Sequence, residues 1–178
     1  MELKTQRLRL RELEPADIPI LYAYNQHPEF QRYESGPPVS EYKFHRIIDD
    51  IIAQQTCEPR FCYYFAMVCA DQVIGSCYLA VRDLDHQQAE IGYVVGFDHW
   101  RKGFATEAAR AIVQFGFEVL DMHRIYAEVI SANQASVRVL EKIGMRREAE
   151  LCENANFSGR WWNTYLYAML AHEYERTS

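Results

Sequence analysis

The sequence lacks the spacings that usually mark a metal centre or a disulfide framework. Its five cysteines are an odd number without a Cys-x-x-Cys pair, and its six histidines show no His-Glu-x-x-His pattern. We therefore expect reduced thiols that are mostly buried, histidines in structural or surface roles, and no bound metal.

Long apolar stretches are also missing. The longest unbroken apolar run, residues 61–70, has ten residues, about half of the ~20 that a membrane-spanning helix needs. The first fifteen residues carry charges throughout and contain no apolar signal-peptide core. We therefore expect no membrane span and a cytoplasmic location.

The chain has no excess of positive charge. Its 19 Lys and Arg against 25 Asp and Glu give a net charge of −6, which repels a phosphate backbone and disfavours a general nucleic-acid binder. The net charge does not exclude a local patch of basic residues. With 178 residues, 49% of them hydrophobic, and no repeat or flexible linker, residues 1–178 are expected to form a single domain.

Apolar periodicity predicts alternating strands and helices. The predicted strands are residues 7–11, 61–70, 73–81, 88–95, 124–130, 145–151 and 160–170, with 61–70 and 73–81 paired as a hairpin. The first predicted helix begins at Pro15, and the second contains Phe44. Two further helices are predicted over residues 102–120 and 133–143. The apolar face of the 102–120 helix comprises Phe104, Ala108, Ile112, Phe115 and Val119. Residues 27–40 and 152–159 are predicted loops.

Residues 88–130 form a predicted strand–helix–strand unit. Such a crossover makes its two strands parallel, and ligands of open α/β sheets bind beyond the carboxyl ends of such strands. The candidate site therefore lies near residues 95–103 and 130–133.

A glycine-containing turn opens the helix of this unit. Gly103 and Ala105 allow a ligand to approach the first free N–H groups of the helix closely. Arg101 and Lys102 precede these groups at the positive end of the helix dipole, where each cation is unfavourable by roughly 0.3–1 kcal/mol unless an anion binds nearby. The pattern favours a polyanionic ligand, and an ordinary tight turn is the alternative.

Three segments together resemble a known family: TQRLRLREL, AEIGYVV followed by WRKGFATEA, and RIYAEVISANQASVRVLEKIGM. They are similar to GCN5-related N-acetyltransferases (GNATs) of the RimJ/RimL type, which act on ribosomal proteins. This resemblance implies an α/β fold, with a mixed, mainly antiparallel sheet that has a central parallel pair and is flanked by helices. It also implies acetyl-CoA as the acetyl donor, with no metal. The family usually has Gln or Arg where this chain has Trp100.

The resemblance also implies which residues bind the coenzyme. N–H groups around residues 102–106 hold the diphosphate, and the strand edge at 93–95 pairs with the pantetheine arm as an added strand would. The implied coenzyme-binding residues are Tyr93, Val94, Val95, Arg101, Lys102, Gly103, Phe104, Ala105, Thr106, Asn133 and Ser136. The alternative role of Asn133 is a helix N-cap.

Two residues are candidates for catalysis by the same resemblance. Glu90 is the candidate base, directly or through water, and strand alternation places it on the face opposite Tyr93. Ser136 matches the hydroxyl that is the candidate proton donor to the departing thiolate in the RimJ/RimL type. Leu140 occupies the position where the wider family often has a tyrosine, so Ser136 or water must serve. The alternatives are a solvated strand carboxylate and an unremarkable first-turn serine.

The implied acceptor is a primary amine, with a protein N-terminal α-amine favoured over a polyamine, amino sugar or antibiotic. Tyr33, Glu34, Trp161 and Trp162 are candidates for lining the acceptor pocket, although such aromatic residues often belong to a core or an interface. A homodimer follows from the resemblance alone. A non-catalytic acyl-CoA sensor and a protein-interaction domain remain open as other classes of function.

Overall fold

The structure is a computed structural model that describes residues 1–33, 38–157 and 159–174. Its strands are β1 (Glu2–Lys4), β2 (Arg9–Glu12), β3 (Cys62–Cys69), β4 (Gln72–Asp83), β5 (Gln88–Val95), β6 (Arg124–Ile130), β7 (Arg146–Phe157) and β8 (Arg160–Leu170). Its α-helices are α1 (Ile18–Asn25), α2 (Pro28–Gln31), α3 (Glu41–Ala53), α4 (Phe104–Glu118), α5 (Gln134–Lys142) and α6 (Ala171–Tyr174). Short 3-10 turns lie at Pro15–Asp17, Gln54–Thr56 and Phe97–His99.

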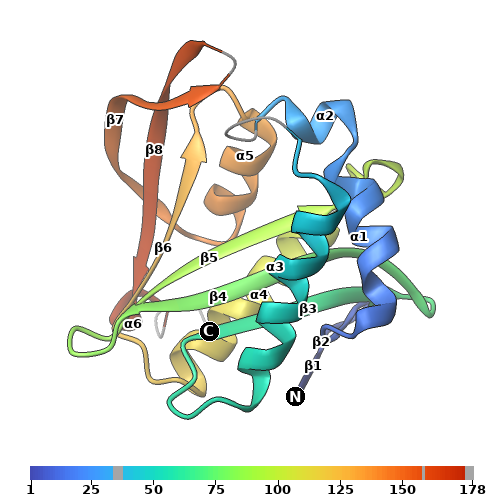
Figure 1. Cartoon of the computed structure of the whole chain (residues 1–178). Helices are drawn as coiled ribbons and strands as arrows, with labels where there is room; N and C mark the ends of the chain where they lie inside the picture. The colour runs from blue at the N-terminus through green and yellow to red at the C-terminus, as the bar shows by residue number, and fades with distance from the viewer. Residues whose placement is uncertain (34–37, 158, 175–178) are drawn as a thin grey trace.

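The strands form one mixed sheet in the order β1-β2-β3-β4-β5-β6-β8-β7 (Figure 1). Every neighbouring pair is antiparallel except β5 and β6, which are parallel and connected by α4. The predicted architecture, a mainly antiparallel sheet with a central parallel pair and flanking helices, is confirmed.

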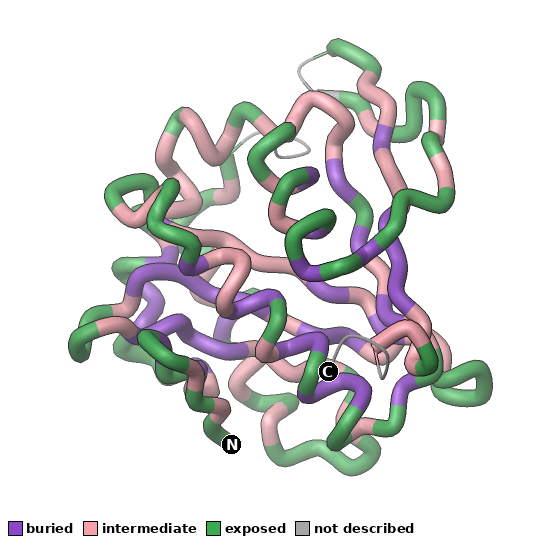
Figure 2. The backbone as a smooth tube through the Cα atoms, turned by 180° about the vertical axis from the view of Figure 1, so that it is seen from behind, coloured by how far each residue is buried: buried purple, intermediate pink, exposed green. Residues whose placement is uncertain are grey.

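Helices cover both faces of the sheet, and strand alternation decides which residues face which helices. Odd-numbered residues of β5 and β6, such as Ile91 and Ile125, belong to the buried cluster that includes α4 and α5. A second cluster forms under α1 and α3 around Leu21, Ile48 and Ala66. The central strands are therefore largely buried while the surface turns are exposed (Figure 2).

The predicted 61–70/73–81 hairpin is present, but its turn lies at Ala70 and Asp71, both with positive φ. The 27–40 segment contains the short helix α2, because Pro28 is tolerated in a first helical turn and the His27 Nδ1 atom accepts a hydrogen bond from the Glu29 N–H. Residues 34–37 of that segment lie outside the described residues.

Two further expectations about the strands are corrected. The short strand β1 was not predicted. Strand β7 continues through most of the predicted 152–159 loop, with irregular pairing between Leu151 and Ala155. Because β7 is an edge strand, its polar residues can meet solvent while the backbone pairs with β8.

Side-chain burial corrects two predictions. Val119 is 64% exposed, because α4 ends at Glu118 and Val119 is its C-cap, whereas the other four residues of the predicted apolar face are buried. All five cysteines are free, but Cys57 and Cys152 are exposed and only Cys77 is fully buried.

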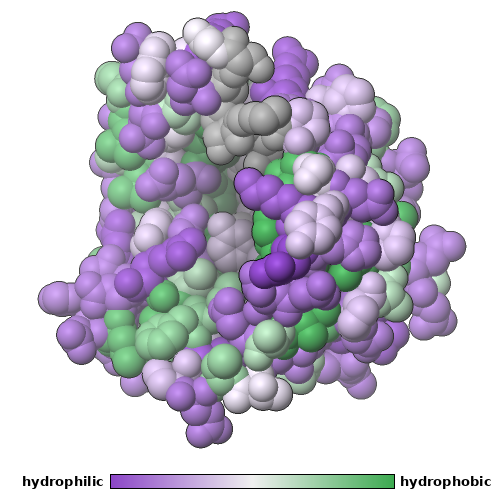
Figure 3. Space-filling view, viewed as in Figure 1, coloured by the Kyte–Doolittle hydropathy of each residue, from purple (hydrophilic) through white to green (hydrophobic). Residues whose placement is uncertain are grey.

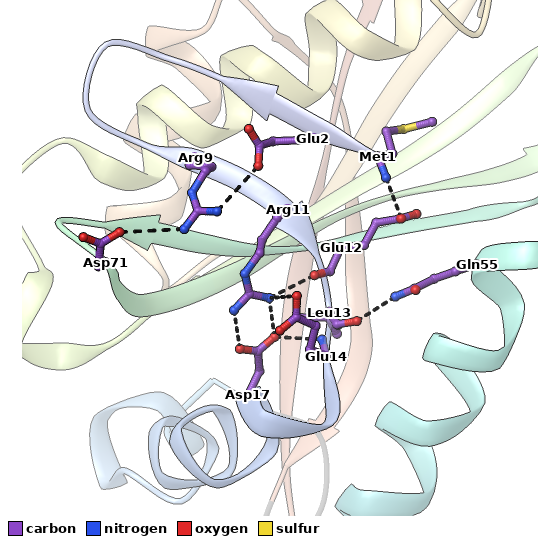
Figure 4. A network of polar contacts seen from close by, with 10 residues as sticks. All are labelled: Met1, Glu2, Arg9, Arg11, Glu12, Leu13, Glu14, Asp17, Gln55 and Asp71. Carbon is purple, nitrogen blue, oxygen red and sulfur yellow. Dashed lines mark hydrogen bonds and ion pairs between the residues drawn. The ribbon is translucent and has the colours of Figure 1, made fainter.

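An ion pair between a partly buried arginine and a buried aspartate ties the turn before α1 to β2. Asp17 is 2% exposed, and its two carboxylate oxygens each accept a hydrogen bond of 2.7 Å from the Arg11 guanidinium. Asp17 also accepts a hydrogen bond of 2.9 Å from the Glu14 N–H (Figure 4). Hydrogen bonding to Asp17 raises the pKa of Arg11 above its ordinary value.

Asp17→Ala should destabilise the fold by about 3 kcal/mol, because it leaves the Arg11 charge partly buried without its partner. Urea unfolding measures this loss. The matched control is Arg9→Gln, since Arg9 is 44% exposed and its ion pairs are 3.6 and 3.8 Å long. The control should lose less than about 1 kcal/mol. Equal losses in both variants would contradict the assignment.

Candidate functional site

The two parallel strands separate after a short paired stretch, and this separation creates the candidate site. β5 and β6 pair at three positions, the last being Glu90 with Tyr126. β5 continues to Val95 and β6 to Ile130 without further pairing between them. The carboxyl-terminal half of β5 therefore has an open edge.

Backbone alternation decides which groups face this edge. The Gly96 N–H donates to the Ile74 carbonyl of the β4 side, and Ser76 is opposite Val94. In an antiparallel pair both backbone groups of alternate residues face the same neighbour. The groups of Val94 therefore face β4, and those of Tyr93 and Val95 face the gap, which narrows the predicted 93–95 edge to two residues.

Trp100 forms a hydrogen bond with one of the backbone groups that face the gap. Its indole Nε1 donates a hydrogen bond of 2.7 Å to the Val95 carbonyl. The Val95 N–H and the backbone groups of Tyr93 remain directed toward the gap. The residue that replaces the family's usual Gln or Arg thus ties the turn after β5 to the strand end.

The turn before α4 presents a row of N–H groups. The first helical hydrogen bond runs from the Glu107 N–H to the Gly103 carbonyl at 3.0 Å. The preceding N–H groups of Phe104, Ala105 and Thr106 have no hydrogen-bond partner among the described residues. Gly103 has a φ of +83°, a conformation that favours glycine.

The two cations at this helix start differ in their contacts. The Lys102 Nζ atom donates to the Asp98 carbonyl at 2.8 Å. The exposed side chain of Arg101 has no hydrogen bond or ion pair with any described residue. The predicted anion site at residues 101–106 therefore has free N–H donors and an uncommitted guanidinium.

Helix α5 brings its first turn to the gap. The Asn133 side chain accepts a hydrogen bond of 3.1 Å from the Ser136 N–H, so its predicted N-cap role is confirmed. The Tyr93 hydroxyl donates to the Ser136 carbonyl at 3.2 Å, and burial raises the pKa of this tyrosine. The Ser136 hydroxyl has no partner among the described residues, so it is available to a ligand.

Glu90 lies at the start of the gap and is held by two neighbours. The Arg82 guanidinium donates to the Glu90 Oε2 atom from Nε at 2.8 Å and from a terminal nitrogen at 2.7 Å. The Tyr78 hydroxyl donates to the other oxygen at 3.3 Å. Burial, together with the Glu90 charge, raises the pKa of Tyr78, so this phenol remains protonated.

Gly92 makes room for this arrangement. A Cβ atom at position 92 would lie 2.4 Å from the Tyr78 ring. The glycine therefore lets Tyr78 lie across β5 toward Glu90.

The two catalytic candidates approach the gap from opposite faces of the sheet. Ser136 belongs to α5, on the face that α4 also covers, and Glu90 is on the face covered by α1 and α3. On this second face the surface is hollowed between the part formed by β7 and β8 and the part formed by the first three helices (Figure 3). A reacting group in the gap would thus meet a carboxylate from one side and a hydroxyl from the other.

The residues predicted to line the acceptor pocket lie in different surroundings. Trp161 is 57% exposed, and the Trp162 ring stacks with Arg160, whose guanidinium carbon is 3.9 Å from the ring centre. Tyr33 stacks with Arg32, and Glu34 lies outside the described residues. No pattern in the sequence singles out Glu128, an exposed carboxylate two residues after Tyr126 on the same face of β6.

Sequence reasoning also missed the residues that hold the site together, among them Arg7, Arg82 and Glu107. Only their charge marks them in the sequence, and their partners are distant or on another strand. Within the described ranges, no three His, Cys, Asp or Glu residues are grouped to hold a metal ion. In the same residues, no helix is long and apolar enough to cross a membrane.

The comparison with known proteins agrees with this geometry. The sequence profile of the acetyltransferase (GNAT) domain matches residues 7–146. The uncharacterized N-acetyltransferase p20 of Bacillus licheniformis is 32% identical over 173 residues, which cover 97% of each chain. The spermidine N(1)-acetyltransferase of Escherichia coli K12 is 25% identical, over 94% of this chain and 88% of its own.

A solved structure shares the fold. The structure of RimJ from Mycobacterium smegmatis in complex with CoA-disulfide has a TM-score of 0.86 and 20% identity, and the match covers 97% of this chain and 88% of that one. At this identity the likeness concerns the fold alone. The family profile spans more than three quarters of the sequence and includes both the β5–α4 turn and α5. The chain therefore belongs to the GNAT family of N-acetyltransferases, enzymes that use acetyl-CoA.

Proposed function

We propose that this chain transfers the acetyl group of acetyl-CoA to the α-amine of a protein N-terminus, by direct attack in a ternary complex. Residues 1–178 act as one N-acetyltransferase domain in this proposal. The observation that carries it is the gap between β5 and β6, with Glu90 at its start and unpaired N–H groups at α4. A homodimer is part of the proposal and rests on the resemblance alone. The cytoplasmic location expected from the sequence is also part of the proposal.

The coenzyme-binding part of the proposal uses the backbone. N–H groups of residues 104–106 and the Arg101 guanidinium would hold the diphosphate, because a helix N-terminus and a cation both favour phosphate oxygens. Tyr93 and Val95 would pair with the pantetheine arm along the open edge of β5. When bound there, acetyl-CoA supplies an activated thioester carbon in the gap.

The proposed role of Glu90 follows from the protonation state of amines. An ammonium has no lone pair for attack, so the acceptor must lose a proton. An α-amine has a pKa of about 7.7–8.0 and is roughly a quarter neutral near pH 7.4, whereas a lysine-type amine is neutral about one time in a thousand. Arg82 and Tyr78 hold the Glu90 carboxylate at the start of the gap, a position that suits a group receiving this proton directly or through water.

Two further negative charges develop during the transfer, one on the thioester oxygen and one on the departing sulfur. The N–H groups of the 93–95 strand that face the gap, those of Tyr93 and Val95, are the candidate donors to the thioester oxygen as it becomes negative. The departing sulfur takes up a proton from the Ser136 hydroxyl or from water. A thiol pKa of about 8.5 makes the thiolate a tolerable leaving group, so Ser136 assists this step modestly.

One observation favours a polyamine as the second candidate acceptor. Glu128 is exposed on the same face as Glu90, and no ion pair engages it among the described residues. A second carboxylate beside the gap suits an acceptor with a second ammonium group. The 25% identity to a spermidine acetyltransferase supports the same candidate.

A thiol-release assay with acetyl-CoA should show turnover of N-terminal peptides and little turnover of polyamines or amino sugars. With an α-amine acceptor, kcat/KM should rise with pH and level off near pH 9, because an amine with a pKa of about 7.7–8.0 is then mostly deprotonated. With a polyamine acceptor, kcat/KM would continue to rise above pH 9.

Turnover restricted to polyamines would overturn the preferred acceptor. CoA binding without any thiol release would favour a sensor, and no thermal shift with acetyl-CoA would favour an interaction domain.

Glu90→Gln should lower kcat by about a hundredfold, because the amide cannot accept the amine proton. CoA affinity should change less than about twofold, since Glu90 lies on the face opposite α4 and α5. Glu150→Gln is the matched control. Glu150 is also a strand carboxylate that accepts a side-chain hydrogen bond, of 2.7 Å from Asn163, but it is exposed and lies on β7. A wild-type kcat for Glu90→Gln would exclude Glu90 as the base.

Ser136→Ala should lower kcat by about two- to tenfold, since water can replace the hydroxyl. The helix cap survives this change, because Asn133 binds the Ser136 backbone N–H and not its side chain. Steady-state kinetics at saturating acetyl-CoA measure the effect. A loss above a hundredfold, or no loss, would each contradict the modest role.

A further inference from the structure

Arg7 and Glu107 join two distant parts of the chain beside the turn that opens α4. Arg7 lies in the turn between β1 and β2, and Glu107 lies in the first turn of α4. The Arg7 Nε atom donates to the Glu107 Oε2 atom at 2.7 Å, and a terminal nitrogen lies 2.6 Å from the same oxygen. The Arg7 backbone N–H donates to the other oxygen at 2.7 Å. Glu107 is therefore held by a side chain and a backbone group of the same residue.

The same arginine also reaches the residues on both sides of Gly103. Its second terminal nitrogen donates to the Lys102 carbonyl at 2.8 Å. The guanidinium lies over the Phe104 ring, 4.6 Å from its centre. Arg7 thus contacts residues 102, 104 and 107, and a lysine could not make these contacts together because it lacks the planar fork of donors.

The turn that Arg7 contacts has a demanding backbone conformation. Arg101 has a φ of +61° and Gly103 has a φ of +83°. A left-handed conformation is unfavourable for a residue with a side chain and persists only where surrounding contacts hold it. The N–H groups that this turn orients, those of residues 104–106, are the ones left without a partner.

Charge makes the position of Glu107 informative. A carboxylate in the first turn of α4 stabilises the helix, but it would repel a phosphate bound at the same helix end. Partial burial would raise the pKa of Glu107, but hydrogen bonds from Thr5 and Arg7 outweigh burial and lower it, so this residue is ionised at neutral pH. By Coulomb repulsion alone, removing this charge should strengthen the binding of a polyanion.

We propose that Arg7 and Glu107 are positioning residues of the coenzyme site. Their contact holds the 101–103 turn in the conformation that presents the N–H groups of α4 to the diphosphate of acetyl-CoA. This inference rests on the proposed function. It assigns a role in the coenzyme site to the β1–β2 turn, which is separated from α4 by about a hundred residues.

Calorimetric titration of CoA into Glu107→Gln and Arg7→Lys tests the sign of the effect. Both variants should bind CoA about tenfold more weakly than the wild type, because misplaced N–H donors lose the diphosphate contacts. KM for acetyl-CoA should rise in parallel while KM for the amine stays within about twofold. The double variant should lose little more than either single variant, since both changes break one contact.

Arg9→Lys is the matched control. Arg9 lies two residues further along, is 44% exposed against 43% for Arg7, and makes only ion pairs of 3.6 and 3.8 Å. It should bind CoA as the wild type does. Because Arg9→Lys keeps the positive charge, an equal loss would show that changes elsewhere near β2 also weaken CoA binding, and it would overturn the role given to the Arg7–Glu107 contact.

The other outcomes are separable. Unchanged or tighter CoA binding by Glu107→Gln would overturn the inference and leave the proposed function intact. Unfolding of both variants, seen by near-UV circular dichroism, would assign the contact to fold stability and also overturn it. A wild-type protein that binds no CoA would refute the proposed function itself.

Discussion

The structure depends on one constraint: β5 and β6 pair as parallel strands for only three residues and then separate. A sheet interior normally pairs all its backbone groups, and a strand edge left open is a place where another extended chain can add. Here the open edge belongs to the two central strands and lies next to the N-terminus of α4. A ligand with an extended arm and an anionic end can satisfy both at once.

The separation also gives the gap two different sides. Glu90 and its partners Arg82 and Tyr78 lie on the face covered by α1 and α3, while Ser136 enters from α5 on the opposite face. Transfer of an acetyl group requires a proton to leave the amine and another to reach the sulfur. In the proposed mechanism, a carboxylate and a hydroxyl on opposite sides of the gap keep these two proton transfers apart.

Local charge matters more at this site than the net charge of −6. Arg82 compensates Glu90, and Arg7 compensates Glu107, so two carboxylates near the gap are neutralised by fixed guanidinium groups. Arg101 and the N–H groups of α4 remain uncommitted among the described residues. An overall acidic protein can therefore present an anion site, because short-range hydrogen bonds outweigh a net charge that solvent screens.

Short-range patterns allowed the sequence to determine the strands and helices around the site, the glycine turn at Gly103 and the Asn133 cap, because these depend on neighbouring residues. The family motifs are likewise contiguous, which is why the fold and the acetyltransferase class could be predicted. Only the tertiary structure decided that Arg7 contacts Glu107 and that Arg82 holds Glu90. It also decided that the backbone N–H and carbonyl of Val94 face β4 and not the gap. It also extended β7 through a predicted loop, since pairing with β8 supplies hydrogen bonds that no local pattern reveals.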